Sequence, residues 1–112
     1  MLADLSKLSA YDLDVVKKCI EASLDKRIIP EMEFSILMGV SHEEAKAIVE
    51  AWPALNSDDE ITQMTIQGSM NNLIGYPHGK FDLIQHDYDI DTAQISEVYL
   101  KVTSSKSTPS SS

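Results

Sequence analysis

Apolar residues at the spacing of an α-helix recur along this chain and limit its fold more than any other feature. The first such segment carries one apolar stripe, made of Leu13, Val16, Ile20 and Leu24. Residues three and four apart lie on one face of a helix, and an apolar face packs against a core. Ser9 stands three residues before Asp12 and is a typical helix N-cap. These residues predict an amphipathic helix of about 16 residues.

Two shorter helices are predicted next, separated by a tight turn. Pro30 suits the first turn of a short helix, and Gly39 suits its left-handed exit. Ser41 and Glu44 have the spacing of a capping box, which opens the second helix. A DNA-reading helix-turn-helix has this outline, but here the second helix exposes mainly glutamates, which phosphate repels. We therefore expect an αα-hairpin over residues 34–52.

A longer helix is predicted to begin at Ser57, which has capping-box spacing with Glu60, and to run to about Ile74. Gly68 lies inside this helix, although glycine costs about 1 kcal/mol relative to alanine there. A close contact with another helix explains such a glycine. The segment Gly75-Tyr76-Pro77-His78-Gly79 then ends the helical pattern.

The stretch from residue 81 to residue 90 is compatible with a loop, a short helix or an edge strand. Apolar and polar residues alternate in part of it, which fits a strand, but it is short and acidic. After it, Asp91 and Gln94 have the spacing to cap a last helix.

These elements predict an all-α fold: a small bundle of four to five helices with an irregular segment at about residues 75–91. We expect residues 1–103 to form a single helical domain, because 112 residues is an ordinary domain size. Residues 104–112 are rich in serine and threonine, have nothing to bury, and are expected to be disordered.

Cysteine content and hydropathy limit the cellular compartments in which we expect the protein. The single cysteine, Cys19, falls on the apolar face of the first predicted helix, so we expect a buried, inert thiol. A lone thiol suits a reducing compartment. The chain has no signal-like opening and no apolar stretch near the ~18–20 residues of a membrane span. We therefore expect a cytoplasmic protein that does not bind a membrane.

The net charge is −9, from eighteen acidic and nine basic residues. Such a surface repels a phosphate backbone, so direct nucleic-acid binding is not expected. Basic proteins are the complementary partners, because opposite charges speed their encounter. The alternative is that the charge only keeps the protein soluble.

Two stretches resemble parts of metal sites. The acids of Asp87-Tyr88-Asp89-Ile90-Asp91 alternate as in an EF-hand loop, but the glycine and the final glutamate of that loop are missing. His78 and His86 flank Asp82, which leaves a metal site at these residues as an alternative. Neither stretch has the spacing of a complete site. We therefore assign no cofactor, no metal ligand and no catalytic residue.

The residues best suited to contact a partner lie after residue 70. Four of them combine amide groups with aromatic rings, as interfaces often do: Asn71, Asn72, Tyr76 and His78. The simpler explanation is a helix end whose asparagines bond to the following loop. Residues 81–100 contain no lysine or arginine and add five candidates: Asp82, Asp87, Tyr88, Asp89 and Asp91.

Several segments resemble a set of short uncharacterised bacterial proteins. They are Pro30-Glu31-Met32-Glu33-Phe34, Leu37-Met38-Gly39-Val40, Ala51-Trp52-Pro53 and Asn71-Asn72-Leu73-Ile74-Gly75-Tyr76-Pro77-His78-Gly79. The last of these matches an Asn-Asn-Leu-x-Gly-Tyr-Pro-His-Gly motif and is the specific one. The resemblance covers roughly residues 10–80 and implies a similar acidic helical layout. It implies no activity, so no functional residue is carried over.

The function expected from the sequence is that of a non-enzymatic protein-binding module. The sharper version is an acidic inhibitor or immunity-type protein that masks a basic partner. One alternative is a small metal-dependent enzyme or metal-binding protein that uses His78, Asp82 and His86. Another is a homo-oligomeric structural protein, with Trp52 or Tyr76 at the interface between copies.

Overall fold

The protein is built from helices throughout the part that the structure, a computed structural model, describes: residues 8–56, 58–75 and 79–103. There α1 spans Ala10–Leu24, α2 Glu31–Met38, α3 His42–Glu50, α4 Glu60–Gly75, α5 Phe81–Tyr88 and α6 Thr92–Thr103. No strand occurs within these ranges. The predicted all-α class is confirmed, and the described residues form six helices where four to five were predicted.

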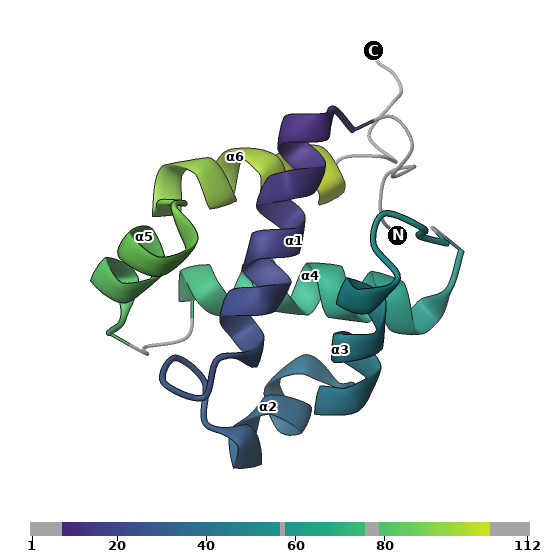
Figure 1. Ribbon diagram of the computed structural model, residues 1–112, viewed down its shortest axis with the longest axis horizontal. Helices are drawn as coiled ribbons and strands as arrows, with labels where there is room; N and C mark the ends of the chain where they lie inside the picture. Colours follow the sequence, from purple (N-terminus) through teal and green to yellow (C-terminus); the bar gives the residue numbers. More distant parts are fainter. Residues whose placement is uncertain (1–7, 57, 76–78, 104–112) are drawn as a thin grey trace.

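Helices α1 and α4 cross at the centre of the molecule, and the other four are arranged around them (Figure 1). The hairpin of α2 and α3 lies on one side of the crossing and packs on both central helices. Helix α6 also packs on α1 and α4, while α5 reaches α1 from the opposite side to α3. None of the described helices is both long and apolar enough to cross a membrane.

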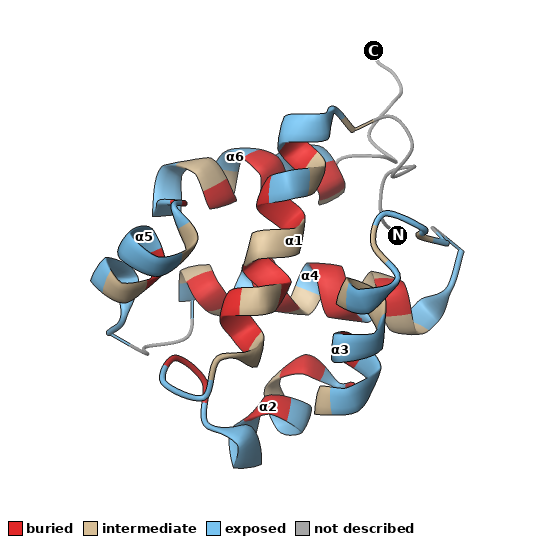
Figure 2. Ribbon diagram, in the orientation of Figure 1, coloured by how far each residue is buried: buried red, intermediate tan, exposed pale blue. Residues whose placement is uncertain are grey.

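The core lies where these helices meet, and Figure 2 shows the buried residues on their inward faces. Its largest fully buried side chains include Phe34, Ile20, Ile29, Ile66, Met70, Leu73, Ile84 and Ile95. The apolar stripe predicted for the first helix is confirmed at Val16 and Ile20, which are fully buried, whereas Leu13 is only half-buried.

Helix α5 corrects the prediction of an irregular segment over residues 75–91. Ile84 and Tyr88 are one helical turn apart, and both pack against the core, Ile84 fully and Tyr88 partly. A strand would place the same two residues on one face as well, since their spacing is even. The period of the pattern therefore could not decide between helix and strand in so short a segment.

Three of the predicted helix starts are confirmed by their hydrogen bonds. The Ser9 hydroxyl accepts from Asp12 N at 3.0 Å. The capping box at α3 has both of its bonds, with Ser41 Oγ accepting from Glu44 N at 3.0 Å and Ser41 N donating to Glu44 Oε1 at 2.8 Å. Gln94 N donates to Asp91 Oδ1 at 2.8 Å in the matching arrangement before α6.

The start of α4 differs from the prediction. The helix begins at Glu60, and the Asp59 carboxylate accepts from the backbone N and the hydroxyl of Thr62, at 2.9 and 2.8 Å. Asp59 is therefore the N-cap, and its place three residues before Thr62 satisfies the same geometric rule. Ser57, the predicted cap, lies outside the described residues.

The predicted close contact at Gly68 is confirmed, and it involves α2. A methyl group at Gly68 would lie 3.3 Å from Met38 Sδ and 3.6 Å from Met38 Cα. The αα-hairpin is also confirmed, because α2 leads into α3 through Gly39, whose φ of +76° is in the left-handed region. Glycine adopts that conformation without steric cost.

Cys19 is fully buried in α1, and burial raises the pKa of its thiol to about 12. We predict that a thiol reagent such as Ellman's reagent does not label the native protein, because the thiolate is the reactive form and the sulfur is inaccessible. Labelling is expected to reach one equivalent only after unfolding in urea, since the chain has one cysteine. Rapid full labelling in native buffer would contradict this burial.

Candidate functional site

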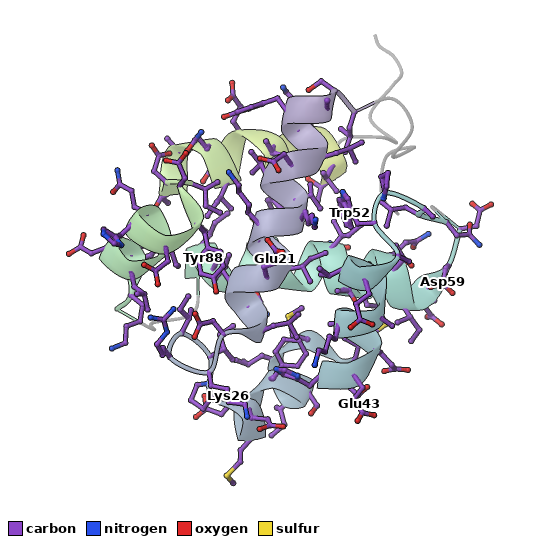
Figure 3. All side chains as sticks on the ribbon, in the orientation of Figure 1. Glu21, Lys26, Glu43, Trp52, Asp59 and Tyr88 are labelled. Carbon is purple, nitrogen blue, oxygen red and sulfur yellow. The ribbon has the colours of Figure 1, made fainter. Side chains whose placement is uncertain are left out.

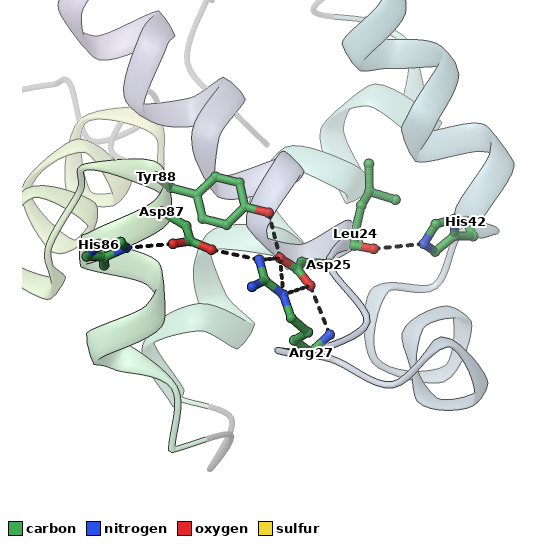
Figure 4. Close-up of polar contacts among 7 residues, drawn as sticks. All are labelled: Leu24, Asp25, Arg27, His42, His86, Asp87 and Tyr88. Atoms are coloured by element: carbon green, nitrogen blue, oxygen red, sulfur yellow. Dashed lines mark hydrogen bonds and ion pairs between the residues drawn. The ribbon is translucent and has the colours of Figure 1, made fainter.

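Five polar side chains join α5 to the turn after α1, and we call them the Asp25 network: Asp25, Arg27, His86, Asp87 and Tyr88 (Figure 4). The Arg27 guanidinium donates to both oxygens of Asp25, with Nη2 to Oδ2 at 2.6 Å, and to Asp87 Oδ2 at 2.7 Å. The Tyr88 hydroxyl donates to Asp25 Oδ2 at 2.8 Å. His86 Nδ1 lies 2.8 Å from Asp87 Oδ1.

The pKa values of the network follow from these contacts. Hydrogen bonding to Arg27 lowers the pKa of Asp25 to about 2. Burial, followed by the bond to the Asp25 carboxylate, raises the pKa of Tyr88 to about 12. His86 and then Arg27 lower the pKa of Asp87. The network therefore holds two ionised carboxylates around one guanidinium at neutral pH.

The Asp25 network fixes α5 against the end of α1. The side chain of Asp25 is only 11% exposed, while that of Arg27 is 59% exposed. The carboxylate is thus held at the bottom of the network and the guanidinium covers it from the solvent side. Because its bonds join α5 to the turn after α1, we assign the network a structural role.

The lowered pKa of Asp25 predicts acid-sensitive stability. Its folded-state pKa of about 2 lies below the ordinary value of 3.8, so its stabilising effect is present above that value and is lost as the pH falls toward 2. Asp25→Asn is expected to lower the urea midpoint at pH 7 and to reduce the further loss between pH 5 and pH 3. The control Glu97→Gln changes an exposed acid on α6 and is expected to keep the wild-type acid sensitivity. Equal pH dependence in Asp25→Asn and wild type would contradict the assignment.

The two asparagines predicted to contact a partner differ in their surroundings. Asn72 is half-buried, and its Nδ2 donates to Gly68 O at 2.8 Å and to Leu37 O at 3.2 Å. The bond to Leu37 O joins α4 to α2, and the bond to Gly68 O lies within α4. The expected bonds from the asparagines to the following loop fall on residues 76–78, which lie outside the described residues, and they stay a prediction. Asn71 is exposed on α4.

The other predicted partner-binding residues are not gathered into one site. Tyr76 and His78 lie outside the described residues. Asp82 and Asp89 are exposed at the two ends of α5, and Asp91 is exposed and caps α6. Asp87 and Tyr88 belong to the Asp25 network. Their use by a partner stays a prediction, and for Asp87 and Tyr88 a partner would have to share groups already bonded within the protein.

The described residues do not form the metal site that the sequence left as an alternative. Asp82 and His86 lie one turn apart on α5, but the His86 ring contacts Asp87, and His78 is not described. Across residues 8–56, 58–75 and 79–103, no group of three or more His, Cys, Asp or Glu side chains is placed to hold a metal ion. The EF-hand-like stretch is divided between the end of α5, a left-handed Asp89 at φ +57°, and the cap of α6.

A shallow hollow of about 350 Å³ lies between the first half of α1 and the turn after α3. Its lining includes Leu13 and Lys17 of α1 together with Trp52 and Pro53. Trp52 is half-buried there and packs against the core (Figure 3). The hollow is open and mostly apolar, which suits a side chain of a partner better than an enclosed substrate.

Exposed acidic residues form two separate surfaces. One, the α3 acidic surface, contains Glu43, Glu44, Glu50, Asp58, Asp59 and Glu60. The other, the α5–α6 acidic surface, contains Asp82, Asp89, Asp91 and Glu97. Helices α3 and α5 stand on opposite sides of α1, so the two surfaces are on different sides of the molecule (Figures 1 and 3).

Sequence reasoning missed two features of the surface. One is the pairing of Arg27 with Asp87, sixty residues away along the chain. The other is the outer side of α2, where Met32 and Ile36 are 87% and 82% exposed. Their spacing of four residues was visible, but α2 is apolar on both sides, so the pattern did not show which side faces the core.

Comparison of the chain with protein-family models, with curated proteins and with solved structures gave no match. What the protein does must therefore be inferred from its own residues.

Proposed function

We propose that the protein is a non-enzymatic module that binds a basic protein partner, in the manner of an acidic inhibitor. The observation that carries the proposal is the excess of exposed carboxylates over bases on the α3 acidic surface. Between residues 42 and 60 this surface carries six acids and a single base, Lys46.

Four bases elsewhere among the described residues are paired with acids of the protein. Lys18 pairs with Asp14 at 3.2 Å, and Lys26 pairs with Glu31 at 3.0 Å. Lys101 pairs with the buried Asp12 at 3.2 Å, and Arg27 belongs to the Asp25 network. The field outside the protein is therefore dominated by the acidic surfaces, and it attracts a basic protein and speeds its approach.

A salt-dependent pull-down from the native host tests the proposal. The immobilised protein is expected to retain a basic protein at low salt and to lose much of it at high salt, because salt screens exposed charges. Two variants locate the surface used: Glu43→Gln with Glu50→Gln and Asp58→Asn on one side, and Asp82→Asn with Asp89→Asn and Glu97→Gln on the other. Recovery of no basic protein, or recovery indifferent to salt and to both variants, would overturn the proposal.

A further inference from the structure

The geometry points to the outer face of α2 as the docking site for a basic amphipathic helix of the partner protein. This inference rests on the proposed function and adds the contact surface and the chemistry of the segment that binds. Its starting observation is the exposure of Met32 and Ile36, at 87% and 82%.

Met32 and Ile36 form one continuous apolar strip. They are four residues apart on the same helix, so their side chains lie one above the other. The opposite side of α2 is buried through Phe34 and Met38. Among the described residues, the other exposed large apolar side chains each lie on a different helix: Tyr11, Met64, Phe81 and Leu100. A helix that is apolar on both sides is normally covered on both sides, so the outer strip has the character of an interface.

The charges around this strip favour a basic occupant. Glu33 is exposed on α2 itself, and Glu43 is exposed in the first turn of α3, which begins soon after α2 ends. Figure 3 shows Glu43 on the outside of α3, toward the end of the molecule where α2 lies. The nearby base Lys26 is engaged by Glu31 at 3.0 Å. A helix with apolar residues on one side and lysine or arginine beside them matches both the strip and its acidic border.

Two other occupants fit less well. A second copy of this chain would bring two molecules of charge −9 together, and they repel each other. A bilayer carrying anionic lipids would meet the same acidic border. Both are outcomes that the experiment below detects.

The test uses a fluorescently labelled synthetic helix with leucine on one face and lysine on the other, and fluorescence anisotropy reports its binding. The wild-type protein is expected to bind this peptide at low salt. The double variant Met32→Gln with Ile36→Gln is expected to bind roughly tenfold or more weakly, since it loses two apolar anchors. Leu100→Gln, which changes a side chain 67% exposed on α6, is the matched control and is expected to bind as wild type does.

Two variants that each neutralise one glutamate complete the experiment. Glu43→Gln is expected to weaken binding and reduce its salt dependence, whereas Glu97→Gln on α6 leaves both unchanged. The substituted residues are exposed, so the urea midpoints of all variants should stay close to that of wild type.

Each contrary result has a defined meaning. Equal peptide binding by the double variant and wild type would overturn docking on α2 while leaving the proposed function intact. No binding of the peptide by wild type would overturn the inference about the partner segment, and the pull-down then decides the proposed function independently. Light scattering that shows a dimer lost in the double variant would assign the α2 face to a second copy and overturn the inference. Vesicle binding that depends on Met32 and Ile36 would overturn it in the same way.

Discussion

Phe34→Ala is expected to destabilise the protein by about 3–5 kcal/mol, a large part of the ~5–15 kcal/mol that stabilises an ordinary domain. Phe34 is fully buried and is the largest of the fully buried side chains. It lies in α2 and meets the His42 ring of α3 edge-on at 5.0 Å between centroids. Its removal leaves a cavity at the point where the hairpin of α2 and α3 joins the core.

Urea unfolding followed by far-ultraviolet circular dichroism measures this effect as a lower midpoint at an unchanged slope. The chain has two phenylalanines, and the other one, Phe81, is 42% exposed at the start of α5. Phe81→Ala is therefore the matched control and is expected to cost about 1 kcal/mol or less. Similar midpoints for the two variants would show that α2 does not pack as described.

Gly68→Leu is expected to have the second-largest effect, a destabilisation of about 1–3 kcal/mol from overpacking. A Cβ at this position already lies 3.3 Å from Met38 Sδ, and the Met38 backbone is directly behind it, with O at 3.5 Å and Cα at 3.6 Å. Further side-chain atoms therefore have to push α2 away from α4. Because Asn72 bridges the same two helices through Leu37 O, that hydrogen bond is strained as well.

Gly75 provides the control, since it is in the same helix and an added Cβ meets nothing within 4 Å. Gly75→Ala is expected to be neutral or to stabilise the protein by up to ~1 kcal/mol, because alanine is the better helix former. Thermal unfolding distinguishes the two, with a shift of several degrees expected per kcal/mol in a domain of this size. Loss of stability in Gly75→Ala and none in Gly68→Leu would contradict the assigned helix contact.

Features set by neighbouring residues could be predicted from the sequence. The caps at Ser9, Ser41 and Asp91 depend on residues three positions apart, and each is present in the structure. The burial of Cys19 followed from its place in an apolar stripe. Gly68 was informative because a glycine inside a helix is unfavourable unless something close requires it.

Features set by distant residues could not be predicted in the same way. The sequence gives no local sign that Asp25 lies beside Tyr88, because that contact depends on how α5 is placed against α1. Residues predicted to be available to a partner therefore turned out to be bonded within the protein. The exposure of Met32 and Ile36 could not be predicted for another reason. In a short helix with apolar residues on both faces, the sequence pattern does not show which face packs on the core.

The central crossing of α1 and α4 also has a consequence for synthesis of the chain on the ribosome. The apolar side of α1 is made early, yet it is covered by α4 and α6, whose residues follow much later. Until α6 has left the exit tunnel, α1 lacks part of the surface that covers it in the finished protein. The nascent chain thus exposes an apolar helix that a chaperone can bind, and complete packing of α1 waits for α6.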